Sequence, residues 1–185
     1  MASDGVVCMS AHKQAHKQDR FIRVVGEIID PSIGIMLMPD EPRAVAFVAA
    51  IGWAESRYLH DHQIGGPALS WWQIEPATHA DIRQYLERHR PGILAEVHMR
   101  LVASLQNFMP DHSLLEFNHH YAAAMCRAFW LRFPERLPPS DDILAMANMW
   151  KRYYNTASGK GRETHFVAAV RPVWDALQVY LEERK

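Results

Sequence analysis

Hydrophobic and polar positions along the chain predict a helical protein. Apolar residues recur at three- and four-residue spacing in most segments, whereas no long alternation of polar and apolar residues indicates a strand. The clearest helix has Asp40 as a capping residue and Pro42 in its first turn, and it extends to about Arg57. Further helices are predicted at residues 77–89, 92–107, 113–132, 141–154 and 164–182. The predicted fold class is therefore mainly α.

Short polar segments mark where several of these helices begin. Residues 113–116, Ser-Leu-Leu-Glu, match a capping box, and Pro76 can open the helix that follows it. The LPPSDD sequence at 137–142 predicts a loop and a helix cap, and ASGKGRE at 157–163 predicts a glycine-rich turn. No repeat and no second domain boundary interrupts this pattern.

The N-terminal region is expected to differ from the rest. Residues 1–20 contain a tandem AHKQAHKQ and few large apolar groups, which predicts a flexible arm preceding a single domain over 21–185. In the apolar segment at 21–38, Asp30-Pro31 and Gly34 are expected to break the chain into two pieces. We predict a helix for the first piece and leave the second open.

Composition narrows the function classes. With 185 residues and 49% hydrophobic content, the chain can form one domain with a substantial core. Twenty basic residues nearly balance 21 acidic ones, so the net charge argues against binding to nucleic acid or to a membrane surface. Eleven histidines make the charge depend on pH.

The cysteines and the N-terminus predict the compartment. Cys8 and Cys126 lie far apart in unlike settings, so no disulfide is expected, and Cys126 in an apolar helix is interpreted as a core residue. The first residues lack the basic and apolar regions of a signal peptide, and no apolar run is long enough to span a bilayer. We expect synthesis in the cytoplasm and no membrane span.

Glu55 is the candidate catalytic residue. Helical steps back from it reach Gly52, Ile51 and Val48, so the glutamate projects from the apolar stripe of its helix. Apolar surroundings disfavour the carboxylate anion, which raises the pKa and allows a glutamate to act as an acid near neutral pH. Alternatively, Glu55 reaches solvent from the last helical turn or pairs with Arg57 or a nearby histidine.

The residues that follow Glu55 carry a family resemblance. After Glu55-Ser56 come a Gly-Gly-Pro turn and the sequence ALSWWQIEPAT at 68–78. This arrangement resembles the lytic transglycosylase and goose-type lysozyme branch of the lysozyme superfamily. In that branch, Glu-Ser ends a buried helix and Ala-x-Gly-Leu-Met-Gln-(Ile/Leu/Val)-x-Pro-x-Thr follows. Gln73 lies 18 residues after Glu55, a separation typical of the family. The positions that match are Ala68, Gln73, Ile74, Pro76 and Thr78.

A third element supports the resemblance, which covers residues 40 to 165. Tyr154-Asn155 corresponds to the family's Ala-Tyr-Asn-x-Gly signature, although Tyr153 replaces its alanine and the next glycine is Gly159. Ser70 replaces the usual glycine, and Trp71-Trp72 replace Leu-Met. These larger side chains would either crowd the floor of the groove or form a platform on which a sugar stacks. Either tryptophan can equally be a packing residue. The arrangement also resembles small bacteriophage proteins encoded near virion genes.

The resemblance implies a lysozyme-like fold and a single-glutamate mechanism on the β-1,4 glycan strand of peptidoglycan. Glu55 would donate a proton to the leaving oxygen and then take one from the 6-hydroxyl of the sugar, giving a 1,6-anhydro product without a metal or cofactor. The implied substrate-binding residues are Ser56, Ser70, Trp71, Trp72, Gln73, Tyr154 and Asn155. A hydrolase would need a second acid, for which Asp61, Glu75 and Asp81 are candidates.

Other interpretations remain open. His60, His62, His119 and His120, or His12 and His16 four residues apart, suggest zinc, but neither set has the spacing of a tetrahedral site, and we predict no metal. A different class of function is a structural virion component, such as a tail, adaptor or core protein, that has the fold without activity. As an enzyme the chain is expected to be carried in a virion and to act at the bacterial cell wall, and other virion proteins are candidate partners of the N-terminal arm.

Overall fold

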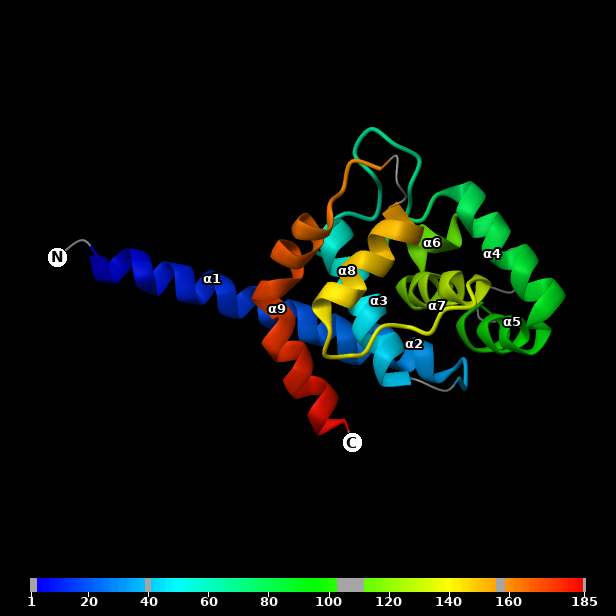
Figure 1. Ribbon diagram of the computed structural model, residues 1–185, viewed down its shortest axis with the longest axis horizontal. Coiled ribbons are helices and arrows are strands. Elements are labelled where there is room, and N and C mark those ends of the chain that lie inside the picture. Colours follow the sequence, from blue (N-terminus) through cyan, green and yellow to red (C-terminus); the bar gives the residue numbers. More distant parts are fainter. Residues whose placement is uncertain (1–2, 39–40, 103–111, 156–158, 185) are drawn as a thin grey trace.

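The computed structural model describes residues 3–38, 41–102, 112–155 and 159–184. These residues are mainly helical and contain no β-strand, so the predicted fold class is confirmed (Figure 1). The N-terminal half contains α1 (Ser3–Val24), the π-helical turn η1 (Val25–Ile29), α2 (Asp30–Gly34), α3 (Glu41–Ser56), α4 (Pro76–His89), α5 (Pro91–Val97) and the π-helical turn η2 (His98–Val102). The second half contains α6 (Leu114–Phe117), α7 (His119–Phe129), the 3-10 turn η4 (Trp130–Arg132), α8 (Ile143–Met149), the π-helical turn η5 (Trp150–Asn155) and α9 (Glu163–Glu183).

Most predicted boundaries agree with these elements to within one or two residues. Pro76 begins α4, as predicted, and Asp142 caps α8 because its carboxylate accepts hydrogen bonds from the backbone N–H groups of Leu144 and Ala145, at 3.1 and 2.9 Å. The helix predicted over 92–107 is observed as far as Val102, and residues 103–111 lie outside the described part of the chain.

The helix predicted over 113–132 is divided, which corrects the capping-box prediction. Ser113 has helical backbone angles and makes no side-chain capping bond to α6. Asn118 has extended backbone angles, and its side-chain oxygen accepts a hydrogen bond from the Tyr121 N–H at 2.9 Å. Asn118 therefore ends α6 and caps α7, the helix that enters the core.

The break predicted at Asp30-Pro31 is also wrong. Pro31 lies at the start of α2, directly after the π-helical turn η1, and the chain stays helical from Ser3 to Gly34 although Pro31 supplies no backbone N–H. The expected arm over residues 1–20 is thus helical from Ser3 onward, and its N-terminal end projects from the body (Figure 1). Gln14 and Gln18 donate side-chain hydrogen bonds to the Pro172 carbonyl, which holds α1 against α9. The flexibility of this arm stays a prediction.

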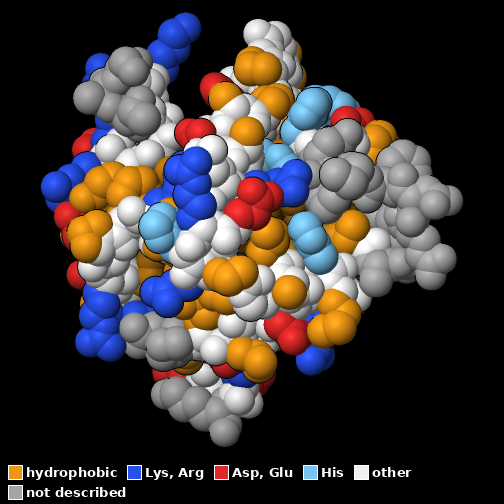
Figure 2. Space-filling view, turned by 90° about the vertical axis from the view of Figure 1, so that its right-hand side faces the viewer, with side chains coloured by type: hydrophobic (Ala, Val, Ile, Leu, Met, Phe, Trp, Pro, Cys, Tyr) orange, Lys and Arg blue, Asp and Glu red, His pale blue; other side chains and the backbone are white. Residues whose placement is uncertain are grey.

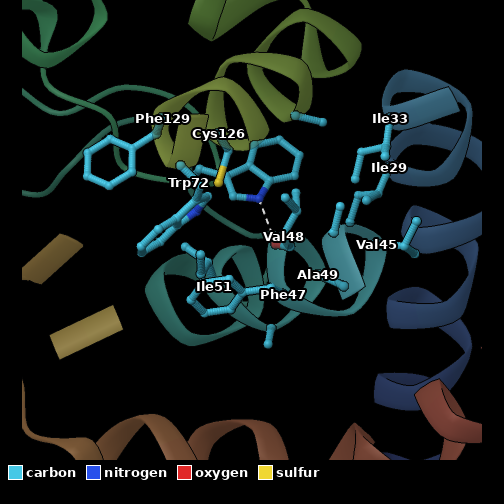
Figure 3. Packing of buried hydrophobic residues seen from close by; sticks show 14 of the residues in the cluster. Ile29, Ile33, Val45, Phe47, Val48, Ala49, Ile51, Trp72, Cys126 and Phe129 are labelled. Atoms are coloured by element: carbon cyan, nitrogen blue, oxygen red, sulfur yellow. Dashed lines mark hydrogen bonds between the residues drawn. The ribbon is translucent and has the colours of Figure 1, made fainter. Parts of the chain in front are cut away.

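Helix α3 is the centre of the hydrophobic core. Every residue from Ala44 to Trp53 is buried, so the helix is apolar around its whole circumference and is covered by α2, α7 and α9. Trp72, from the loop after α3, fills the space between α3 and the Cys126–Phe129 side of α7 (Figure 3). Its indole N–H donates to the Val48 carbonyl at 2.9 Å. Burial of each large apolar side chain contributes roughly 1.5–3 kcal/mol to folding.

The loop from Arg57 to Glu75 is irregular but closely tied together. Leu69 and Ile74 exchange backbone hydrogen bonds at 2.9 and 2.8 Å, and the Ser70 N–H donates to the Asp61 carbonyl at 2.6 Å. Ser70 and Gln73 have positive φ angles of 67° and 53°, a conformation that only this local network holds in place. The loop therefore presents its side chains from a fixed backbone.

Among the described residues, no helix has both the length and the apolar character needed to cross a bilayer.

Candidate active site

Glu55 lies in the last turn of α3 and is partly buried. Burial raises the pKa of its carboxyl group, because desolvation disfavours the anion. One hydrogen bond opposes this effect: the Trp150 indole N–H, from η5, donates to Glu55 Oε1 at 2.8 Å and favours the charged form. Burial is the larger of the two influences.

The alternative in which Glu55 pairs with Arg57 is not observed. The Arg57 guanidinium donates instead to the Trp53 and Ala54 carbonyls at the C-terminal end of α3. Within the described part of the chain, no basic side chain forms an ion pair with Glu55. The carboxyl group therefore has an indole donor and an apolar setting, without a cation that would lower its pKa.

Tyr154 is within electrostatic reach of Glu55 and lines a surface cavity, whereas Glu55 is not among the described residues that line that cavity. Its hydroxyl donates to the Trp72 carbonyl at 2.6 Å, which links η5 to the loop after α3. The pKa of Tyr154 is raised well above its ordinary value, first by burial and then by the nearby charges of Cys126 and Glu55. The tyrosine is thus a neutral hydroxyl close to the candidate acid.

A cavity of about 380 Å³ extends from Tyr154 along the surface between the loop, α4, α7 and η5. Gln73, Tyr154 and Asn155 all line it, so the structure brings together three of the predicted substrate-binding residues that are up to 82 residues apart. The Gln73 amide nitrogen donates to the Ser70 carbonyl at 2.7 Å and to the His60 carbonyl at 3.3 Å. These two bonds fix the amide and leave its oxygen for a ligand.

Two of the three candidates for a second acid line the same cavity. Glu75 and Asp81 line it, whereas Asp61 lies on another side of the loop with its carboxylate 3.9 Å from His119 Nδ1. Asp81 is itself 3.9 Å from Arg132 Nη1. Of the three candidates, Glu75 and Asp81 are therefore the ones placed to act on a ligand in this cavity.

Ser56, Ser70 and Trp72 have little or no exposed surface, so their predicted role in substrate binding stays a prediction that burial disfavours for direct contact. Trp72 and Ser70 are fully buried, and Ser56 is only 5% exposed. Ser56 Oγ donates to the Gly52 carbonyl at 3.2 Å, and Ser70 Oγ accepts from the Trp72 N–H at 3.2 Å. These three side chains hold the loop against α3 because their polar groups find partners inside the protein.

Trp71 is placed differently from Trp72. It is partly exposed, and its ring stacks on His119 with the ring centroids 3.6 Å apart and the planes 16° from parallel. Of the two adjacent tryptophans, one packs in the core and the other lies against a histidine at the surface. His119 thereby covers one face of the Trp71 ring.

The histidines near the loop pair with separate partners. His62 Nε2 lies 2.9 Å from Glu116 Oε1, and His120 Nδ1 lies 3.1 Å from Ser32 Oγ. The described residues contain no group of three or more His, Cys, Asp or Glu side chains arranged to hold a metal ion. His12 and His16 are exposed on α1.

Two residues of the site were not predicted from the sequence as functional. Trp150 was interpreted as core, and only its position opposite Glu55 makes it a hydrogen-bond donor to the acid. Arg132 also lines the cavity, with its guanidinium carbon 4.4 Å from the Phe129 ring centroid. No local sequence signal marks either residue, because both acquire a role through contacts with segments far away in the chain.

The surface around these elements carries both basic and acidic side chains, without a large region of one charge among the described residues. On the face that includes the end of the molecule with α4 and α5, blue and red side chains are interspersed with apolar ones and histidines (Figure 2). This mixture agrees with the net charge of −1 and gives no broad basic surface on that face for a polyanion.

No protein-family model, curated protein or solved structure matches this chain. The site is therefore interpreted from its own geometry and from the residues that carry the resemblance.

Proposed function

We propose that this chain is a lysozyme-like lytic transglycosylase that cleaves the β-1,4 glycan link of peptidoglycan, with Glu55 as its acid and base. The observation that carries the proposal is the setting of Glu55: burial raises the pKa of its carboxyl group, and no cationic side chain among the described residues pairs with it. Its charge acts on Tyr154, which lines the polar cavity, although Glu55 itself is not among the described residues that line it. A carboxyl group with a raised pKa keeps its proton to higher pH than an exposed one, which suits the role of a general acid.

In the proposed reaction, Glu55 donates its proton to the glycosidic oxygen as the bond from that oxygen to C1 breaks. The positive charge on C1 and its ring oxygen is then captured by the 6-hydroxyl of the same sugar, and the Glu55 carboxylate takes the hydroxyl proton. The product is a 1,6-anhydro sugar, and the acid is restored without water. Trp150 holds Oε1 by a hydrogen bond, which leaves Oε2 to carry the proton.

The other residues would bind and orient the glycan. Gln73, Tyr154 and Asn155 line the cavity, and their amide and hydroxyl groups suit the acetamido and hydroxyl groups of an amino sugar. The Asn155 amide oxygen already accepts a hydrogen bond from Lys151 Nζ at 3.0 Å. Trp72, Ser70 and Ser56 support this surface from below. Trp71 presents only the part of its ring that His119 leaves uncovered.

The setting of the activity is part of the same proposal. The chain would be carried in a bacteriophage virion and act at the bacterial wall, with α1 as the segment that contacts other virion proteins. The projection of the N-terminal end of α1 from the body supports this assignment (Figure 1).

Zymography on purified peptidoglycan tests the proposal with wild type, Glu55→Gln and the control Glu163→Gln, which removes an exposed carboxylate at the start of α9. We expect wild type and the control to clear the substrate and Glu55→Gln to lose activity by roughly 10²–10⁴-fold, the usual contribution of a general acid. Clearing by Glu55→Gln at the wild-type rate would contradict the role of Glu55. Absence of clearing by all three proteins would favour a structural virion component.

Mass spectrometry of the released fragments decides between the two reaction types. A transglycosylase gives 1,6-anhydro ends, whereas a hydrolase that uses Glu75 or Asp81 gives reducing ends.

A further inference from the structure

A second cavity of about 280 Å³ lies between α1, the C-terminal end of α3 and α9, away from the cavity beside Tyr154. We call it the Trp53 cleft; its lining includes Lys17, Arg20, Trp53, Arg57, Ala169 and Pro172. Three of these side chains are cationic, and none of the described residues that line the cleft is acidic. None of the three cations forms an ion pair with a carboxylate of the described residues.

Two guanidinium groups meet at one indole ring. The Arg20 and Arg57 guanidinium carbons lie 5.4 and 5.8 Å from the centroid of the Trp53 ring. The contact with an aromatic ring engages the face of a guanidinium and leaves the N–H groups at its edge for acceptors. Arg20 Nε is buried and has no hydrogen-bond partner, so an anion in the cleft would meet Arg20 through its terminal NH₂ groups.

The backbone that carries Lys17 and Arg20 and the guanidinium of Arg57 are held in position before any ligand binds. Lys17 and Arg20 are three residues apart on one face of α1, and Gln14 and Gln18 fasten that helix to the Pro172 carbonyl of α9. Arg57 is fixed by its bonds to the Trp53 and Ala54 carbonyls, which use only Nη1. A site whose donors are already oriented loses little entropy when it binds an anion.

We propose that the Trp53 cleft is a binding site for a dianionic oxyanion of the phosphate class. Three converging cations favour a ligand with two negative charges over a monoanion, and guanidinium edges match the oxygen atoms of phosphate. The ligand is either the free ion or a phosphate monoester on a larger molecule. This site is independent of Glu55 and of the proposed reaction.

The test uses the full chain and the indole N–H of Trp53, which donates to the Ala169 carbonyl at 3.0 Å and reports on the cleft. Its signal in ¹H–¹⁵N NMR spectra is assigned with the variant Trp53→Phe. Sodium phosphate, glucose 6-phosphate, glucose and sodium acetate are titrated at constant ionic strength. We expect a saturable shift with phosphate, and none with glucose or acetate. A shift with glucose 6-phosphate identifies a monoester site, and its absence identifies a site for the free ion.

The matched variants are Lys17→Gln/Arg20→Gln and Arg88→Gln/Arg90→Gln, which remove the same charge, the second pair from exposed positions near the end of α4. We expect the first pair to weaken phosphate binding at least tenfold and the second to change it less than twofold. Equal losses in both variants, no saturable shift in wild type, or an equal response to acetate would overturn the proposal. If the first variant is less stable by thermal unfolding, Arg57→Lys, which retains the charge but not the fork of donors, is expected to weaken binding in its place.

Discussion

Gly52 gives the sharpest test of how the core supports the site. It lies inside α3, one turn before Glu55, and a Cβ atom there would come within 2.5 Å of Tyr58 Cε1 and 2.9 Å of Trp72 Nε1. Neither ring can withdraw freely: the Tyr58 hydroxyl donates to the Ala49 carbonyl at 2.7 Å, and the Trp72 indole donates to the Val48 carbonyl. The substitution Gly52→Ala therefore forces at least one buried hydrogen bond to break or lengthen.

The expected magnitude follows from three contributions. Alanine gains about 1 kcal/mol over glycine in a helix interior. Overpacking of a dense core costs about 1–3 kcal/mol, and loss of a buried hydrogen bond costs about 1–3 kcal/mol. We expect Gly52→Ala to lower the free energy of unfolding by about 1–5 kcal/mol.

Urea unfolding measures this change, with Gly92→Ala as the matched control. Gly92 is also helical, in α5, but an added Cβ meets nothing within 4 Å there. The control should therefore be as stable as wild type or more stable by up to about 1 kcal/mol. If Gly52→Ala were as stable as the control, the packing of Tyr58 and Trp72 against α3 would be wrong.

Two further predictions concern the charge of Glu55. Because burial raises the folded-state pKa of Glu55 above its ordinary value of 4.5, the folded protein binds the proton more tightly, and wild-type stability falls as pH rises from below 4.5 through the folded pKa. Glu55→Gln cannot ionise at this position, so its free energy of unfolding relative to wild type should increase as pH rises through the folded pKa. Urea unfolding at a series of pH values measures this difference. A difference that stays constant with pH would refute the raised pKa. Trp150→Phe removes the one hydrogen bond that favours the anion, so the pKa of Glu55 should rise and the alkaline limb of the pH–rate profile on peptidoglycan should move to higher pH. A limb that stays in place or moves to lower pH would show that Trp150 does not act on this carboxyl group.

The helices were predictable because their signals are local. The boundaries of α3, α4, α8 and α9 follow from apolar spacing, Pro76 and the Asp142 cap. The errors occurred where a local signal had two solutions. Pro31 can break a helix or begin one, and Asn118 rather than Ser113 caps the helix because the chain turns there to bring α7 into the core.

The candidate site was predictable only in part. Glu55 was marked by its place on an apolar stripe, and Gln73, Tyr154 and Asn155 by resemblance; the structure places the last three on one cavity. The contribution of Trp150 and the burial of Ser70 could not be read from the sequence, since both depend on which distant segments pack against them.

The sequence by itself determined the helical class, most helix positions and the apolar setting of Glu55, because periodicity, caps and proline act within a few residues. Only the tertiary structure decided which tryptophan enters the core, which donor reaches the carboxyl group and how three cations gather at Trp53. These outcomes require segments separated by tens of residues to pack together, and the geometry of that packing is set by the shapes of all the side chains in the core at once.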